Sequence, residues 1–426
     1  MTVDVLSPPA QAERQARTAV AVLFFTNGAL FANLLPRFPQ IKADLGIGNA
    51  AYGLAVAAFP TGAIVAGLAA GALIRRYGSG RVAVAGTVLT GIGVLAAGLS
   101  GSVVLFGTAL LLAGAMDAIT DVAQNAHGLR VQRRYGRSII NSFHAIWSIG
   151  AVTGGSMAAG AIALDLSLGQ HLLISAVVFG IAACVALRFC LTGPDTEPDV
   201  EAAKEETKGE AKGATNGGAA RETGAESREL APGRDEKLRK TRLRTGYVLA
   251  ALVLIAASGA LVEDAGSSWA ALYLSDSLHA SGTLAASGYI ALVGAQFVGR
   301  MIGDRLVDRF GQRAVARSGG VIAAVGMGLA LAVPTATGTI LGFATAGFGV
   351  ATLVPAAMHE ADELPGLRPG SGLTIVSWLM RLGFLLSPPI VGLVADSTSL
   401  RVGLLVVPLA GLMVMVLAGV LQPRRR

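Results

Sequence analysis

The chain has 426 residues, of which 53% are hydrophobic and only 14% are charged. Soluble domains carry about 25% charged residues, so this sequence lacks the polar side chains that would cover a soluble core of its size. The net charge of +7 comes from basic residues placed between apolar segments, which argues against nucleic acid as a partner. Composition therefore predicts an all-α polytopic membrane protein surrounded by the lipid bilayer.

Apolar stretches of membrane-spanning length recur along the whole chain. A spanning helix needs about 20 predominantly apolar residues, and about twelve stretches meet this requirement. They lie at residues 18–36, 51–74, 82–100, 103–127, 138–164, 168–190, 246–272, 283–303, 317–334, 338–358, 371–394 and 400–421. We therefore expect about twelve transmembrane helices, six in each half of the chain.

A polar segment separates the two sets of six stretches. It has no hydrophobic period and is rich in Glu, Lys and Arg, so it cannot bury enough apolar surface to offset the entropy of ordering. We expect a disordered, charged linker there. The predicted parts are an N-terminal tail, a six-helix bundle, the linker, a second six-helix bundle and a basic tail, at residues 1–17, 18–191, 192–244, 245–421 and 422–426.

Basic residues mark alternate loops. Arg residues follow the second, fourth and eighth stretches and occur near both chain ends, whereas the loops at residues 101–102 and 335–338 contain none. Because cytoplasmic loops carry an excess of Lys and Arg, both termini and the linker are expected to be cytoplasmic.

The two halves share a loop pattern. Arg76-Tyr77-Gly78 follows the second stretch, and Arg309-Phe310-Gly311 follows the eighth, 233 residues later. A repeat of six spans predicts two pseudo-symmetric bundles, related by an axis along the membrane normal, with a cavity between them.

This loop pattern resembles the signature of the major facilitator superfamily, and the resemblance covers nearly the whole chain. It implies a secondary active transporter with a cytoplasmic gate. Two departures from the family pattern, Arg75 in place of aspartate and Asp304 in place of glycine, suggest a gate that depends mainly on the second half. Shorter runs resemble an uncharacterised bacterial inner-membrane branch allied with fucose-permease-like sugar transporters. The implied gate residues are Gly71, Arg76, Gly78, Arg81, Asp304, Asp308, Arg309, Gly311 and Arg313.

The fourth stretch carries the densest polar pattern at membrane depth. Asp117, Asp121 and Asn125 recur every four residues, which places them on one helix face. Lipid cannot solvate two carboxylates, so this face is predicted to line the cavity and to serve proton coupling or substrate binding. The alternative is a structural role, in which the carboxylates pair with cytoplasmic arginines. His127 is expected at the solvated membrane surface.

Further candidates lie in the first, fifth and eleventh stretches. Asn27 is expected to line the cavity or to form a helix–helix hydrogen bond. His144 has the acid–base chemistry for proton coupling; its alternative is a hydrogen bond to the backbone of a neighbouring helix. Trp147 can stack on a sugar or serve helix packing. Trp378 and Arg381 are spaced i, i+3 and should share a helix face. Arg381 suits an anionic substrate or a carboxylate on another helix.

Two adjacent acids, Glu263 and Asp264, lie in the seventh stretch. Adjacent side chains point about 100° apart on a helix, so we do not expect both to face one partner. Glu263 is the first candidate for a proton carrier, because burial favours the neutral carboxyl form; alternatively, both acids are hydrated near the outer end. Trp269 is expected in the aromatic belt at the membrane surface.

No pattern for covalent chemistry is present. The sequence has no P-loop and no Cys/His cluster with metal-binding spacing, so we expect neither an enzyme nor a metal or cofactor. The favoured function is a proton-coupled, symporting permease for a small molecule such as a sugar or carboxylate, acting as a monomer. The alternatives are a proton-driven drug or metabolite exporter and a non-transporting membrane sensor or scaffold.

Overall fold

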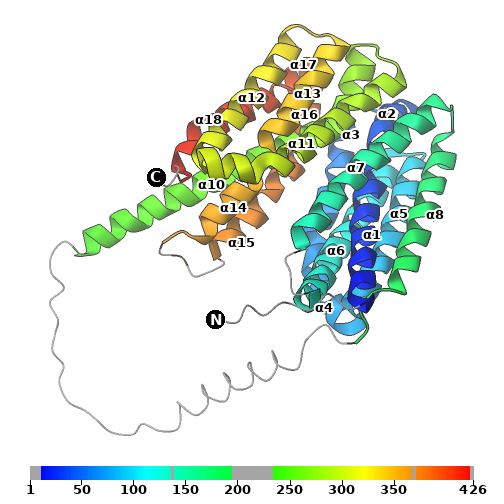
Figure 1. Ribbon diagram of the computed structural model, residues 1–426. Helices are drawn as coiled ribbons and strands as arrows, with labels where there is room; N and C mark the ends of the chain where they lie inside the picture. The colour runs from blue at the N-terminus through cyan, green and yellow to red at the C-terminus, as the bar shows by residue number, and fades with distance from the viewer. Residues whose placement is uncertain (1–10, 136–138, 194–233, 366, 368–370, 423–426) are drawn as a thin grey trace.

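The computed structural model describes residues 11–135, 139–193, 234–365, 367 and 371–422 (Figure 1). In this part of the chain all regular structure is helical, and twelve segments are long and apolar enough to cross a membrane. The predicted class and number of spans are confirmed. The first half comprises α1 (Gln11–Ala32), η1 (Leu35–Arg37), α2 (Phe38–Leu45), α3 (Asn49–Val56), α4 (Ala58–Tyr77), α5 (Ser79–Gly98), α6 (Val103–Tyr135), α7 (Ile140–Ala163) and α8 (Leu168–Leu187).

The second half repeats this plan with more interrupted spans. A helix of π type follows α10, and the spans built from α13 and α14, and from α15 and α16, are each broken by one or two residues. Its elements are α10 (Arg234–Leu272), η2 (Tyr273–Ser277), α11 (Gly282–Phe310), α12 (Gln312–Ala332), α13 (Ala336–Val350), α14 (Leu353–Asp362), α15 (Ser371–Leu379), α16 (Arg381–Ser397), α17 (Leu400–Gly403), α18 (Val406–Leu417) and η3 (Ala418–Val420).

Several helices extend beyond the bounds that hydropathy predicts. α6 continues to Tyr135 and α11 to Phe310, past the expected ends at residues 127 and 303. α1 begins inside the expected tail, and α10 begins at Arg234, so residues 234–244 are helical where a disordered linker was expected; residues 194–233 lie outside the described residues. The 20-residue criterion measures only the hydrocarbon core, whereas Arg, Lys and Gln are good helix formers that continue a helix into water.

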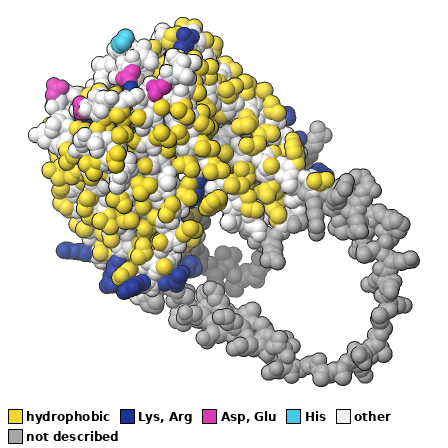
Figure 2. All heavy atoms as spheres, turned by 180° about the vertical axis from the view of Figure 1, so that it is seen from behind, with side chains coloured by type: hydrophobic (Ala, Val, Ile, Leu, Met, Phe, Trp, Pro, Cys, Tyr) yellow, Lys and Arg dark blue, Asp and Glu magenta, His cyan; other side chains and the backbone are white. Residues whose placement is uncertain are grey.

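The helices form two bundles that lie side by side, α1–α8 in one and α10–α18 in the other (Figure 1). The bundles separate towards the end where α1 begins and α8 ends, which we call the terminal end. At the opposite, far end they are in contact, where α7 packs against α11 and α3 against α16. Lys and Arg side chains gather at the terminal end, below a broad hydrophobic band (Figure 2).

The repeat predicted from the loop pattern is visible in the backbone. Gly78 and Gly311 end α4 and α11 with φ of 85° and 84°, and each N–H donates to the carbonyl four residues earlier, at 2.8 and 2.7 Å. A side chain would be strained at this left-handed φ. The preceding arginines also match, because Arg76 lies over the ring of Tyr77 and Arg309 over that of Phe310.

Helix crossings follow the same repeat. A Cβ added to Gly114 on α6 would collide with the carbonyl of Phe59 on α4, and one added to Gly347 on α13 would collide with that of Leu292 on α11. Both pairs are 233 residues apart in the numbering. Backbones in direct contact are a common packing mode of membrane helices, where small residues replace the missing hydrophobic driving force.

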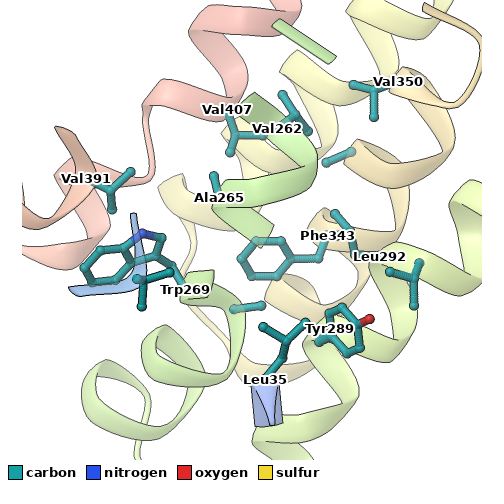
Figure 3. Packing of buried hydrophobic residues seen from close by; sticks show 14 of the residues in the cluster. Leu35, Val262, Ala265, Trp269, Tyr289, Leu292, Phe343, Val350, Val391 and Val407 are labelled. Atoms are coloured by element: carbon teal, nitrogen blue, oxygen red, sulfur yellow. The ribbon is translucent and has the colours of Figure 1, made fainter. Parts of the chain in front are cut away.

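The largest apolar cluster extends from one bundle into the other at the far end. Leu35 of the first bundle lies beside Tyr289 of α11, and Trp269 lies in the same cluster (Figure 3). The expectation that Trp269 belongs to a surface aromatic belt is wrong, because its side chain is 0% exposed. Sequence position near a membrane surface cannot distinguish a lipid-facing tryptophan from one that packs between bundles.

Candidate functional site

A hydrogen-bonded polar cluster connects three helices of the first bundle. Asn27 on α1 donates through Nδ2 to Asp117 Oδ1 on α6 at 2.7 Å, and its Oδ1 accepts from Trp147 Nε1 on α7 at 2.8 Å. Gln124 Nε2 lies 3.4 Å from the same Asn27 oxygen. Asn27 therefore makes helix–helix hydrogen bonds, and it fixes the positions of Asp117 and Trp147.

The next turn of α6 carries a carboxylate that faces the second bundle. Asp121 Oδ1 accepts from Asn125 Nδ2 at 3.0 Å and from Gln124 Nε2 at 3.4 Å. Its charge also interacts with His144 of α7 and with Arg381 of α16. Asp121 and Asn125 thus contact each other on α6, and the charge of Asp121 acts on both the neighbouring α7 and the opposite bundle.

The facing cluster in the second bundle is centred on Glu263 of α10. Its Oε2 accepts from Gln296 Nε2 at 2.6 Å and lies 3.5 Å from Arg300 Nη2. Arg300 also interacts electrostatically with His144 of the first bundle. Gln296 and Arg300 were not among the predicted site residues, although two polar residues at i, i+4 inside an apolar stretch were a usable signal.

Arg381 and Trp378 are separated by a break in the helix. α15 ends at Leu379 and α16 begins at Arg381, so the predicted pair spans two helical segments. Trp378 is 55% exposed. Among the described residues Arg381 forms no ion pair, and its charge acts on Asp121 of the opposite bundle.

A set of contacts between the bundles closes the far end, and we call it the far-end gate. Tyr52 of α3 donates its hydroxyl to the Ser268 carbonyl at 2.8 Å and packs edge-on against Trp269. Lys42 pairs with Asp276 at 3.2 Å. The Asp396 carboxylate of α16 accepts from the first two backbone N–H groups of α3, Asn49 at 2.9 Å and Ala50 at 2.8 Å, and so caps that helix from the opposite bundle.

Asp264 lies beneath this gate. Its Oδ1 is 3.5 Å from Ser268 Oγ, and the Ser387 hydroxyl of α16 is adjacent. Its Oδ2 is buried and has no hydrogen-bond partner. The expectation that Glu263 and Asp264 face different partners agrees with these contacts, whereas hydration of both acids does not.

At the terminal end, the predicted gate residues of the first bundle do not contact those of the second bundle among the described residues. Asp304, Asp308 and Arg76 are exposed, and among the described residues neither aspartate forms an ion pair. Arg313 instead donates through Nε to the Leu421 carbonyl at 2.9 Å, within its own bundle. The structure therefore has a closed far end and separated bundles at the terminal end.

His127 is buried, so its expected place at the solvated membrane surface is wrong. Its Nδ1 lies 2.8 Å from Ser79 Oγ, and its Nε2 accepts from the Leu191 N–H at 3.1 Å. These contacts tie α6 to the start of α5 and to the chain after α8. Burial also raises the pKa of the adjacent Cys190 thiol to about 11, which keeps it protonated and unreactive.

Comparisons with known proteins agree with this architecture. The model of the Major Facilitator Superfamily matches residues 20–366 and 265–426. The uncharacterised transporter y4wD of Sinorhizobium fredii is 28% identical over 95% of this chain and 97% of its own length. Among solved structures, the nucleoside transporter NupG superposes with a TM-score of 0.68 at 12% identity, covering 96% of this chain and 99% of its own.

A D-xylose–proton symporter also superposes with a TM-score of 0.68, at 16% identity and over 95% of this chain and 96% of its own. At such identities the structural likeness shows the fold alone. The family match extends over both bundles, and the resemblance of the loop pattern to the family signature is thereby confirmed. The chain is a membrane protein that belongs to the Major Facilitator Superfamily.

Proposed function

We propose that the protein is a secondary active transporter that moves a small polar solute through a bacterial inner membrane by alternating access, coupled to protons. The observation that carries this proposal is the pair of facing clusters, Asp121 and His144 in one bundle and Glu263, Arg300 and Arg381 in the other. Charged groups at membrane depth that are directed at the opposite bundle mark a pathway for a solute or an ion.

The excess of Arg and Lys at the terminal end supports a cytoplasmic location for that end. With this orientation the structure corresponds to an inward-open state, because the far-end gate is closed towards the outside. The two termini and the predicted gate residues would then lie on the cytoplasmic side. The solute is released unchanged, so the proposed activity is not enzymatic, and the proton gradient supplies the driving force in place of a cofactor.

A sugar or a carboxylate is the proposed class of solute. The clusters offer carboxylate and amide oxygens for hydroxyl donors, and two guanidinium groups for anionic or hydroxyl oxygens. Trp378, which is 55% exposed, adds an aromatic surface of the kind that sugars stack on. The names of two similar structures, a nucleoside transporter and a D-xylose–proton symporter, are consistent with a polyhydroxylated solute.

The test is transport by the purified protein in vesicles that enclose a pH-sensitive dye. Pentoses, hexoses, nucleosides and organic acids are added outside, one class at a time. Acidification of the lumen on addition of a sugar or acid supports proton symport, and protein-free vesicles supply the baseline. Proton efflux provoked by a lipophilic cation would support an exporter instead. If no labelled solute enters or leaves and the dye does not respond, the proposal is wrong.

A further inference from the structure

One acid with a buried carboxyl oxygen is not used by the facing clusters. Asp264 lies on α10 under the far-end gate, with its Oδ2 atom inaccessible to solvent and without a hydrogen-bond partner. Within the described residues no Lys, Arg or His forms an ion pair with it. An ionised carboxylate in such a place lacks the partners that normally compensate for the loss of water.

The group that covers Asp264 comes from the other bundle. Tyr52 of α3 donates to the carbonyl of Ser268, and the Ser268 hydroxyl in turn lies 3.5 Å from Asp264 Oδ1. Tyr52 and Trp269 are both 0% exposed, so water is excluded from this side. Ser268 of α10 therefore makes both contacts: its carbonyl accepts from Tyr52 across the gate, and its hydroxyl faces Asp264.

In the part of the chain that the structure describes, the remaining neighbours of Asp264 supply no positive charge. Glu263, the next residue on α10, interacts unfavourably with Asp264, and its own ion pair is with Arg300. From α16 the facing group is the neutral hydroxyl of Ser387, and from α3 it is the neutral phenol of Tyr52. Asp276, the other acid near Tyr52, is paired with Lys42 at the rim of the gate.

We propose that Asp264 is a proton-binding site whose occupancy allows the far-end gate to close. The inference rests on the proposed function and names the group that links the proton to the gate. When the bundles separate at the far end, Tyr52 withdraws and water solvates the Asp264 carboxylate. Binding of one proton at Oδ2 gives the neutral acid, which can be buried under Tyr52 at much lower cost. A proton taken from outside thus precedes closure towards the outside.

The test measures the width of the far end directly. Cys184 and Cys190 are replaced by Ala, and spin labels are attached at Gly101→Cys and Thr337→Cys. Gly101 lies in the far-end loop before α6, and Thr337 is an exposed residue in the first turn of α13, at the far end of the other bundle. Gly101 has open space around the position of an added Cβ. Distance distributions are recorded in lipid nanodiscs between about pH 5 and about pH 9, a range that covers carboxyl groups in water and in buried sites.

The expected result is a long-distance population in the parent protein that grows as pH rises. Asp264→Asn, which mimics the neutral acid, should keep the short distance at every pH, and Asp264→Glu should retain a pH response. Asp165→Asn is the matched control, because Asp165 is an exposed acid at the same end of the molecule and should behave like the parent.

Two outcomes would overturn the inference: a parent protein whose distances do not change with pH, or an Asp264→Asn variant that responds as the parent does. Because no solute is present, the result is independent of the transport assay. A pH-driven gate in a protein that transports nothing would leave the inference intact and refute the proposed function. Transport with a gate indifferent to Asp264 would do the reverse.

Discussion

Replacing Tyr52 by Phe isolates a single hydrogen bond of the far-end gate. The change removes the hydroxyl that donates to the Ser268 carbonyl at 2.8 Å. It keeps the ring, whose centroid is 5.0 Å from that of Trp269. The bond joins the two bundles, so it exists only while the far end is closed. Its loss is therefore expected to destabilise the closed state relative to the open one.

The magnitude follows from the burial of the bond. A typical intramolecular hydrogen bond contributes a net stabilisation of about 0.5–1.5 kcal/mol. Tyr52 is 0% exposed, so no water takes the place of its hydroxyl while the gate is closed. A loss of about 1 kcal/mol changes the equilibrium constant between the two states about fivefold. We expect this factor in the ratio of far-open to far-closed protein.

The spin-label pair described above measures that ratio at fixed pH. Tyr52→Phe should increase the ratio of long to short distances, and Tyr77→Phe supplies the matched control. Tyr77 is 49% exposed on the terminal side, and it makes its described contact through the ring face with Arg76. An unchanged ratio in Tyr52→Phe, or an equal change in Tyr77→Phe, would refute the role assigned to this bond.

Three further substitutions test the clusters between the bundles. Glu263→Gln should abolish proton-driven accumulation and leave solute exchange intact, because the amide cannot carry a proton; accumulation at the parent rate would exclude Glu263 as the carrier. Arg381→Gln should weaken solute binding about 10- to 100-fold in a binding titration, because it removes one charge-assisted hydrogen bond worth about 1.5–3 kcal/mol. Arg188→Gln is the control, because Arg188 is an exposed arginine just after α8. Asn27→Ala should destabilise the first bundle by about 2 kcal/mol, because Asp117 and Trp147 lose their shared partner; an unchanged thermal unfolding midpoint would contradict this.

The spans and the repeat could be predicted because both depend on local properties of the chain. A span must supply enough consecutive apolar residues to cross the hydrocarbon core, and this length is readable without knowing any neighbour. The turn at Gly78 and its counterpart at Gly311 depend on backbone conformation, which again is local. Helix ends were less predictable, because α6 and α11 continue past the apolar stretch to Tyr135 and Phe310, where hydropathy no longer indicates the end of a helix.

The site could be predicted only in part, because the partner of a polar side chain is chosen by the tertiary structure. The spacing of Asp117 and Asp121 indicated a shared face, but nothing local indicated that Asn27 would bind the first of them. His127 looked solvated from its position, yet the chain after α8 covers it, with the Leu191 N–H donating to its ring. Tyr52 carried no signal at all, since its role arises from the approach of the opposite bundle.

Glu263 and Asp264 show how adjacency in sequence can separate two chemical tasks. The helix turns their side chains apart, so Glu263 is directed to Gln296 and Arg300 on α11, while Asp264 is directed to Ser387 on α16. Glu263 has the guanidinium of Arg300 beside it, whereas among the described residues Asp264 forms no ion pair and lies under the gate. On α10, Glu263 therefore belongs to the cluster between the bundles, and Asp264 belongs to the far-end gate. Because both side chains are fixed to the same helical turn, a change in the charge of one acts on the other, and solute binding near Arg300 is expected to be sensed at the gate.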